Sequence, residues 1–293
     1  MAGVVSRTAA ELRETADMVA FKHSVFALPF AVISLITAAD RGWPTPWVWL
    51  WFVVAMVSAR TAAMAFNRLA DHEIDAANPR TSGRSLPANR LDRRFAWGVT
   101  GVAAATFVVA AAMLNRTCML LAPPTLAVLL GYSYAKRFTA AAHLWLGLAL
   151  GLAPIGAWIA VTARLDSPPL VLAAAVGLWV AGFDVIYSLQ DETFDRSHDL
   201  RSLPAVVGGQ RSLAVARLFH VGAIVGFAVF AAMAGGGWLR AAAVLTAGAL
   251  LLWQHRLVTH DDLGAVDAAF FTANGALSIA MCLLFVAAKA GGW

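Results

Sequence analysis

The stretch that decides the fold runs from Asn67 to Pro87 and reads NRLADHEIDAANPRTSGRSLP, with apolar sequence on both sides. Asn67, Asp71 and Asp75 are spaced by four residues, and each such step turns a helix by about 400°, so the three side chains are expected on one face. Five arginines lie in or near the stretch: Arg68, Arg80, Arg84, Arg90 and Arg93. Carboxylate and carboxamide oxygens beside guanidinium groups suit a hard divalent cation together with a phosphate. The stretch is therefore predicted to be one half of a metal–phosphate site.

The composition places this stretch in a membrane protein. The chain has 293 residues, of which 60% are hydrophobic and 13% charged, and its mean hydropathy is +0.70. A soluble domain carries about 25% charged and 45–50% apolar residues, so an ordinary soluble protein is excluded. Apolar runs of about 20 residues recur along the chain, as expected for membrane-spanning helices. An all-α polytopic fold is predicted, with spans near residues 21–39, 47–69, 95–114, 117–134, 142–163, 169–190, 212–235, 238–257 and 265–288.

The distribution of basic residues predicts the orientation of these nine spans. The loops of one side hold most of the lysines and arginines, among them the five arginines above. The other side receives Arg41, Arg116, Arg164, Arg240 and Lys289. Because cytoplasmic loops carry the excess of positive charge, the Asn67–Pro87 stretch is expected at the cytoplasmic face of the membrane.

A second acidic cluster resembles the first. Asp184, Asp191 and Asp195 are spaced so that all three face one way at the end of the sixth span. Arg-Ser-Leu-Pro follows each cluster, at positions 84–87 and 201–204. This weak repeat favours a single domain over residues 1–293 with two pseudo-repeated halves, about 1–140 and 141–293, and a shared site between them. Chance similarity of two short motifs is the alternative.

Two opposed acidic faces require counter-cations to remain ionised in a medium drier than water. Oxygen ligands without clustered histidine or cysteine favour Mg²⁺, which commonly bridges carboxylates to substrate phosphates. The alternative is a pair of solvated helix ends. The functional interpretation is favoured because Arg60 and Asp184 each lie inside a span, seven residues before Asn67 and Asp191 respectively, and ionisable residues within spans usually face an interior cavity.

A third polar element, GYSYAKRFT at residues 131–139, ends the fourth span. Lys136 and Arg137 are candidates to bind a diphosphate, with Tyr132 one turn before Lys136, although the two cations alone would be ordinary topology anchors. A charged site at the mouth of a lipid-facing cavity suits a lipid diphosphate, whose head stays at the mouth while its tail lies in the bilayer. Metal ions favour departure of the diphosphate, and aromatic walls stabilise the cation that remains.

At these residues the chain resembles the UbiA superfamily of intramembrane prenyltransferases. Its first Asp-rich motif is similar to Asn67-x3-Asp71-x3-Asp75, its Tyr-x3-Lys element to Tyr132-x3-Lys136, and its second Asp-rich motif to Asp184-x6-Asp191-x3-Asp195. The resemblance implies nine helices in a ring around a central cavity. Ser85 departs from the family, in which proline is common at that position.

Within the superfamily the chain looks most like the bacterial 4-hydroxybenzoate polyprenyltransferase branch, through residues 22–30, 64–68 and 184–191. The resemblance implies Mg²⁺-dependent transfer from a polyprenyl diphosphate to the ring carbon of an aromatic hydroxy acid in quinone biosynthesis. The favoured acceptor is 4-hydroxybenzoate, of the ubiquinone pathway. The alternative is 1,4-dihydroxy-6-naphthoate, of a menaquinone pathway.

The expected roles follow from this interpretation. The metal ligands are Asn67, Asp71, Asp75, Asp191 and Asp195, and the diphosphate ligands are Arg80, Arg84, Lys136, Arg137 and Tyr132. Asp71, Asp191, Arg60 and Asp184 are the candidate catalytic residues, with Arg60 for the carboxylate of the acceptor and Asp184 to orient either Arg60 or the acceptor.

Other functions remain as alternatives. A secondary transporter would also be polytopic with a repeat, but its polar sites would be expected near the middle of the membrane rather than at one face. A purely structural protein has no use for the aligned carboxylates. A haem farnesyltransferase or a chlorophyll synthase would share the Asp motifs and differ in the acceptor.

Overall fold

The structure is a computed structural model that describes residues 14, 24–40, 42–260 and 262–292. Lys22 and His23, which contribute to the resemblance, lie outside the described residues. A helix occupies each of the nine predicted spans: α2 (Ser24–Ala38), α3 (Pro46–Ala70), α5 (Arg93–Leu114), α6 (Arg116–Gly131), α7 (Ala142–Thr162), α8 (Ser167–Ser188), α11 (Gly209–Met233), α12 (Trp238–Leu257) and α13 (Asn274–Ala290).

The all-α membrane fold is thereby confirmed, although not every helix is long and apolar enough to cross a bilayer by itself. In the described part of the chain, seven helical segments meet both criteria. The helix α2 is shorter, with 15 residues, and α12 is not among the seven. Helices are therefore present at all nine predicted spans, and seven of them have the length and hydropathy of a span.

Local capping explains where several helices begin. Thr45 precedes Pro46, the first residue of α3, and its hydroxyl oxygen accepts a hydrogen bond from the Val48 amide at 3.4 Å. The carboxylate of Asp92 accepts from the Arg94 amide at 2.7 Å at the start of α5. Asn115 caps α6 in the same way through the Cys118 amide at 2.9 Å. These side chains satisfy amides that have no partner within the helix, so the polar residues between spans define the helix ends.

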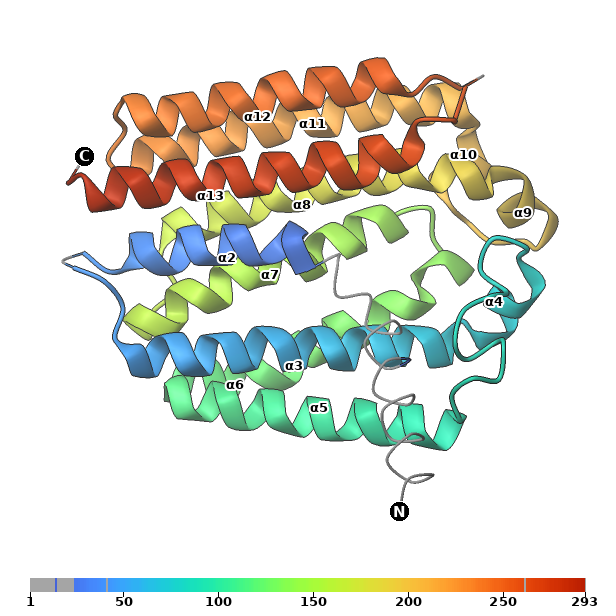
Figure 1. The fold of residues 1–293 in the computed structure, drawn as a ribbon, viewed down its shortest axis with the longest axis horizontal. Helices are drawn as coiled ribbons and strands as arrows, with labels where there is room; N and C mark the ends of the chain where they lie inside the picture. The colour runs from blue at the N-terminus through green and yellow to red at the C-terminus, as the bar shows by residue number, and fades with distance from the viewer. Residues whose placement is uncertain (1–13, 15–23, 41, 261, 293) are drawn as a thin grey trace, which may run out of the picture.

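The helices form a closed circuit with a second group beside it. Contacts run from α2 to α7, α8, α11, α12 and α13 and back to α2, while α3, α5 and α6 pack together and touch α7 (Figure 1). Buried side chains from this circuit form the main core, which includes Phe30, Trp179, Phe183, Phe227 and Phe230. The aromatic interior therefore lies within the circuit that contains α8, the helix that carries the second acidic cluster.

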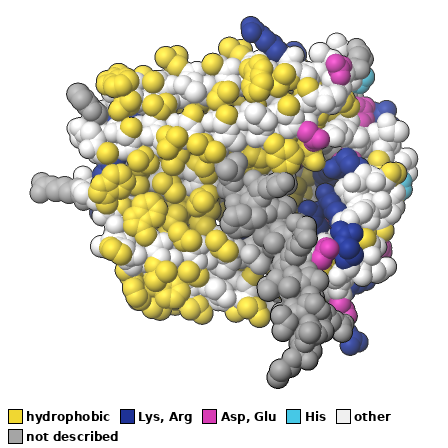
Figure 2. Space-filling model, viewed as in Figure 1, with side chains coloured by type: hydrophobic (Ala, Val, Ile, Leu, Met, Phe, Trp, Pro, Cys, Tyr) yellow, Lys and Arg dark blue, Asp and Glu magenta, His cyan; other side chains and the backbone are white. Residues whose placement is uncertain are grey.

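The short helices gather at one end of the molecule. They are α4 (His72–Ala77), α9 (Glu192–Ser197), α10 (Leu203–Val207) and the 3₁₀ helix Tyr132–Arg137. On the visible face, acidic and basic side chains concentrate at this end, at the right of the picture, and hydrophobic side chains cover most of the rest (Figure 2). The fold therefore brings the loops after both acidic clusters to the same end.

Two glycines allow α7 and α8 to approach closely. A Cβ atom built on Gly147 would lie 2.2 Å from the carbonyl oxygen of Gly177, and one on Gly151 would lie 2.7 Å from that of Ala173. Real Cβ atoms do not come so close, so only glycine fits at both positions. Because the helices are antiparallel, this contact also sets the register of His143, one turn before Gly147, against Asp184 on α8.

Candidate active site

The two acidic clusters share one local geometry. Asp71 separates α3 from α4 with φ −95° and ψ 10°, and Asp191 precedes α9 with φ −101° and ψ 2°. Each bend is followed by a helix of six residues whose fourth residue is a buried aspartate, Asp75 or Asp195, exposed by 5% and 3% respectively. The three residues predicted to share one helical face are divided between two helices, because α3 ends at Ala70 and Asp75 lies on α4. The amides of Asp71 and Asp75 nevertheless donate to the carbonyls of Asn67 and Asp71, at 2.9 and 2.7 Å.

The loop after α4 joins the two clusters through an arginine. Arg80 binds both carboxylate oxygens of Asp191, with Nε–Oδ1 at 2.9 Å and Nη2–Oδ2 at 2.5 Å. Asn78 donates from Nδ2 to the same Oδ1 at 3.1 Å. Arg84 pairs with Asp75 at 2.6 Å, and Arg68 lies 3.9 Å from the other oxygen of Asp75. Residues more than 100 positions apart thus meet at one site.

The third polar element faces the same place. The charge of Lys136 lies within range of both Asp71 and Asp191. Arg137 has Nη2 at 3.7 Å from the carboxylate of Asp71 and also donates to the Ala70 carbonyl. Tyr132 lies within electrostatic range of Asp71 and Asp184. All the cations that the sequence predicts for the diphosphate are consequently near one or both acidic clusters.

The pKa of Asp71 shows that bringing these carboxylates together makes their ionisation less favourable. Burial, followed by the negative charge of Asp75, raises the pKa of Asp71 from 3.8 to about 6. Lys136, Arg137 and a 2.9 Å hydrogen bond from the Asn67 amide oppose this rise in pKa. An additional cation would lower the cost of ionising Asp71 further.

Two buried carboxylate oxygens indicate where such a cation fits. Oδ2 of Asp75 and Oδ2 of Asp195 are buried and make no hydrogen bond in the part of the chain that the structure describes, although Arg68 approaches the Asp75 oxygen to 3.9 Å. An orphaned carboxylate oxygen is expensive to bury unless it is paired or binds a metal. Oxygen donors of this kind match the preference of Mg²⁺. The described residues contain no group of three or more His, Cys, Asp or Glu side chains arranged to hold a metal, and Arg80 and Arg84 pair with Asp191 and Asp75. The oxygen donors thus fit Mg²⁺. For the ion to bind, Arg80 and Arg84 would have to release some of their contacts with the carboxylates.

Arg60 and Asp184 do not contact each other in the part of the chain that the structure describes. Asp184 contacts His143 on α7, with Nδ1 and Oδ2 2.7 Å apart. Arg60 is half-buried on α3, about 10 Å along the helix axis from Asn67. Of the two roles expected for Asp184, the structure offers no support for orienting Arg60.

Aromatic side chains begin directly beneath the arginine–aspartate pair. The Arg80 guanidinium lies 5.4 Å from the centre of the Tyr187 ring and donates to its hydroxyl at 3.2 Å. The Tyr187 ring is 4.2 Å from that of Phe270, which contacts Phe26 and Phe183 at 5.2 Å each. Such faces stabilise a nearby cation. The aromatic walls expected from the sequence are therefore adjacent to the polar site.

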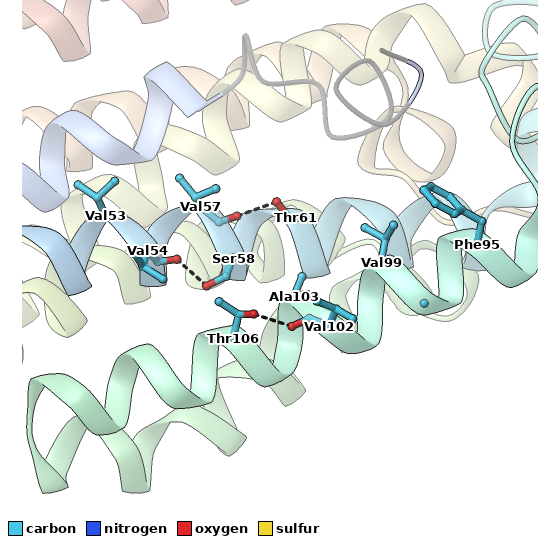
Figure 3. A pocket seen from close by; sticks show the side chains of 11 residues that line it. Val53, Val54, Val57, Ser58, Thr61, Phe95, Val99, Val102, Ala103 and Thr106 are labelled. Carbon is cyan, nitrogen blue, oxygen red and sulfur yellow. Dashed lines mark hydrogen bonds between the residues drawn. The ribbon is translucent and has the colours of Figure 1, made fainter. Parts of the chain in front are cut away.

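A separate hollow of about 670 Å³ between α3 and α5 contains none of the predicted site residues (Figure 3). Its lining is apolar apart from Ser58, Thr61 and Thr106, and each of these hydroxyls donates to a carbonyl of its own helix. With these hydroxyls engaged, the hollow suits hydrocarbon rather than a charged group.

Sequence reasoning missed three residues of the site: Asn78, Tyr187 and His143. Asn78 and Tyr187 lie within the quoted motifs, but their partners are fixed only by the meeting of the two halves. His143 had a visible signal, because it is an ionisable residue at the start of a predicted span.

Comparison with known proteins identifies the arrangement. Residues 27–281 match the profile of the UbiA prenyltransferase family. The chain belongs to this family. It is 28% identical over 236 residues to a 4-hydroxybenzoate octaprenyltransferase of Salmonella paratyphi B, covering 80% of this chain and 81% of the relative.

Solved structures share the fold over nearly the whole chain. An apo UbiA homologue from Aeropyrum pernix K1 is 31% identical with a TM-score of 0.79, over 92% of this chain and 98% of that one. A UbiA homologue from Archaeoglobus fulgidus bound to GPP and Mg²⁺ is 17% identical with a TM-score of 0.74, over 94% and 99%. The protein is thus a prenyltransferase of the UbiA family, and the resemblance drawn from the motifs is confirmed.

Proposed function

We propose that this UbiA-family enzyme transfers a polyprenyl group from a polyprenyl diphosphate to the ring carbon of an aromatic hydroxy acid in quinone biosynthesis. The observation that carries the proposal is the meeting of two aspartate pairs, of which Asp75, Asp191 and Asp195 are buried, with four basic side chains beside an aromatic interior. The Salmonella relative is named for 4-hydroxybenzoate, and the Archaeoglobus homologue is bound to GPP and Mg²⁺. We therefore favour 4-hydroxybenzoate as the acceptor.

The charged end of the molecule would hold the diphosphate. Asn67, Asp71, Asp75, Asp191 and Asp195 are the proposed ligands of Mg²⁺, supported by the two orphaned oxygens of Asp75 and Asp195. The chemistry that bound Mg²⁺ supplies is neutralisation of the leaving diphosphate. Arg80 and Arg84 exchange their carboxylate partners for diphosphate oxygens, with Lys136, Arg137 and Tyr132 completing the site. A guanidinium group binds a carboxylate and a phosphate in the same bidentate way. Each arginine can therefore replace one partner with the other without losing hydrogen bonds.

The reaction would take place next to the diphosphate site, on the side of the aromatic interior. The carbon–oxygen bond of the donor breaks, and Tyr187 and Phe270 face the allylic cation. The ring carbon next to the hydroxyl of the acceptor forms the new bond and loses its proton. Arg60 binds the carboxylate of the acceptor, and Asp184 orients its hydroxyl. The excess of basic residues in the loops of this side supports a site at the cytoplasmic face of a bacterial inner membrane.

The metal assignment is tested by prenyl transfer in membranes. Labelled polyprenyl diphosphate, Mg²⁺ and 4-hydroxybenzoate are supplied to the wild type and to Asp71→Ala and Asp191→Ala, with Glu73→Ala, an exposed acid on α4, as the matched control. Both aspartate variants should lose transfer while the control retains it. Undiminished transfer in either aspartate variant contradicts the assignment.

The acceptor is tested by offering 4-hydroxybenzoate and 1,4-dihydroxy-6-naphthoate side by side. Faster transfer to 4-hydroxybenzoate is expected, and preference for the naphthoate would move the enzyme to the menaquinone pathway. For Arg60→Ala, KM for the acceptor should rise far more than KM for the donor. The reverse pattern rejects its proposed role.

A further inference from the structure

A buried histidine outside all the recognised motifs contacts Asp184. The side chain of His143 is 2% exposed and that of Asp184 is 16% exposed, and Nδ1 of the ring lies 2.7 Å from Oδ2 of the carboxylate. The close approach of α7 and α8 at Gly147 and Gly177 creates this contact, because it fixes the position of each helix against the other. The packing of α7 against α8 therefore fixes the positions of His143 and Asp184 relative to each other.

The hydrogen bond of the second ring nitrogen shows which nitrogen of the neutral histidine carries the proton. Nε2 accepts a hydrogen bond from the backbone amide of Leu203 at 3.2 Å, and a nitrogen that accepts cannot carry a proton. Neutral His143 must then hold its proton on Nδ1 and donate it to Asp184. This is the arrangement by which a fixed histidine orients a carboxylate.

The contact leaves one oxygen of Asp184 available. In the part of the chain that the structure describes, Oδ2 is the atom that contacts His143, and no hydrogen bond to Oδ1 is present. Asp184 lies within electrostatic range of Tyr132. It lies on α8 one turn before Tyr187, and α8 ends at Ser188, three residues before Asp191. That position is beside the aromatic wall, below the proposed diphosphate site.

We infer that His143 is a positioning residue, which holds Asp184 so that Oδ1 accepts a hydrogen bond from the hydroxyl of the aromatic acceptor. This inference rests on the proposed function. His143 itself need not touch the acceptor: it fixes the rotation of the carboxylate. A carboxylate that accepts from the hydroxyl makes the neighbouring ring carbon richer in electrons and holds that carbon toward the donor.

The same histidine joins Asp184 to the second Arg-Ser-Leu-Pro loop. Leu203, whose amide binds His143, belongs to this loop, and the amide of Arg201 donates to the carbonyl of Lys136 at 2.7 Å. The acceptor site and the diphosphate-binding Lys136 are thus held by one short segment, residues 201–203.

The test compares two substitutions of His143 with a matched control. His143→Phe keeps a ring and removes both hydrogen bonds, whereas His143→Gln supplies one amide donor and one amide acceptor in their place. His220→Phe is the control, because His220 is also buried, at 3% exposed, and binds a backbone carbonyl of α8 at 3.2 Å, away from the acidic clusters. Transfer kinetics are measured for donor and acceptor separately. Binding of 4-hydroxybenzoate and of 4-methoxybenzoate, which lacks the hydroxyl donor, is measured by competition.

His143→Phe should lower kcat/KM for the acceptor by about 10- to 100-fold, the range for losing a hydrogen bond to a charged group, while KM for the donor changes by less than about threefold. The preference for 4-hydroxybenzoate over 4-methoxybenzoate should disappear in His143→Phe and persist in His220→Phe. His143→Gln should recover most of the lost activity.

Three results would overturn the inference: equal effects of His143→Phe and His220→Phe, equal losses toward donor and acceptor, or a hydroxyl preference that survives His143→Phe. A wild-type enzyme that prenylates no aromatic hydroxy acid would instead overturn the proposed function and this inference with it. Melting temperatures of all variants in detergent identify any loss that comes from unfolding alone, and His143→Gln then carries the test.

Discussion

Arg80 is expected to have opposite effects on the metal and on the diphosphate. In the described structure its guanidinium occupies both oxygens of Asp191, a proposed metal ligand. Mg²⁺ must therefore displace or share this arginine. Once the diphosphate is bound, the same arginine is free to bind the diphosphate oxygens. Arg80→Gln should then strengthen binding of the metal alone and weaken Mg²⁺-dependent binding of the prenyl diphosphate.

The size of the effect follows from the contact. Hydrogen bonds to charged groups contribute about 1.5–3 kcal/mol. The Asp191 side chain is 8% exposed but that of Arg80 is 31% exposed, so solvent screening reduces the net value to about 1–2 kcal/mol. This corresponds to about a 5- to 30-fold gain in affinity for Mg²⁺ alone. A loss of similar size is expected for the diphosphate.

The assay is calorimetric titration of purified protein in detergent, first with Mg²⁺ and then with a non-hydrolysable prenyl diphosphate analogue at saturating Mg²⁺. Arg90→Gln is the matched control, because Arg90 is in the same loop and pairs with Glu14 at 2.9 Å instead of with the acidic clusters. Arg80→Gln should also lower the melting temperature without metal, since Asp191 loses its counter-ion, and Mg²⁺ should restore it. If Arg80→Gln weakens both ligands alike, the exchange of partners is refuted.

Three further predictions concern packing, the orphaned oxygens and the aromatic wall. Gly147→Val should destabilise the protein by about 1–3 kcal/mol through overpacking against α8, which a lower melting temperature would show. Gly98→Ala, which has open space around its Cβ position, should leave the melting temperature unchanged. Equal melting temperatures of the two variants would contradict the close approach of α7 and α8. Asp195→Asn should raise the melting temperature without metal, because it removes a buried charge whose Oδ2 makes no hydrogen bond. The same substitution should abolish stabilisation of the protein by Mg²⁺. If Mg²⁺ still stabilises the variant, Asp195 is not a metal ligand. Tyr187→Phe keeps the ring against Phe270 and loses only the hydroxyl that binds Arg80, so transfer should fall by less than about tenfold, and Tyr187→Ala should reduce it further; equal losses would show that the ring contributes nothing.

The residues of the polar site could be named from the sequence because their signal is local. Each acidic cluster follows a long apolar run, and carboxylates spaced by four residues at such a boundary are chemically distinctive. The same reasoning predicted that Asn67, Asp71 and Asp75 share one helical face, whereas in the structure α3 ends at Ala70 and Asp75 lies on the short helix α4. Spacing alone could not reveal the end of α3, since the residues on both sides of it are helical.

Contacts between distant parts of the chain were beyond such reasoning. The binding of Asp191 by Arg80 and of Asp184 by His143 joins residues 111 and 41 positions apart. His143 has no motif around it, so only the register of α7 against α8 gives it a partner. Likewise, the sequence left open whether Asp184 orients Arg60 or the acceptor, and the packing places His143 against Asp184.

The sequence by itself determined the membrane class, the helical segments and the two acidic motifs of Asn67–Pro87 and Asp184–Asp195. It could do so because hydropathy and local spacing are properties of neighbouring residues, and the bilayer permits few backbone structures. The tertiary structure alone decided that Arg80 of the first loop pairs with Asp191 of the second cluster, and that His143 contacts Asp184. These pairings depend on where helices touch, which is set by shape at positions such as Gly147 and Gly177, and shape is a property of the whole packed bundle.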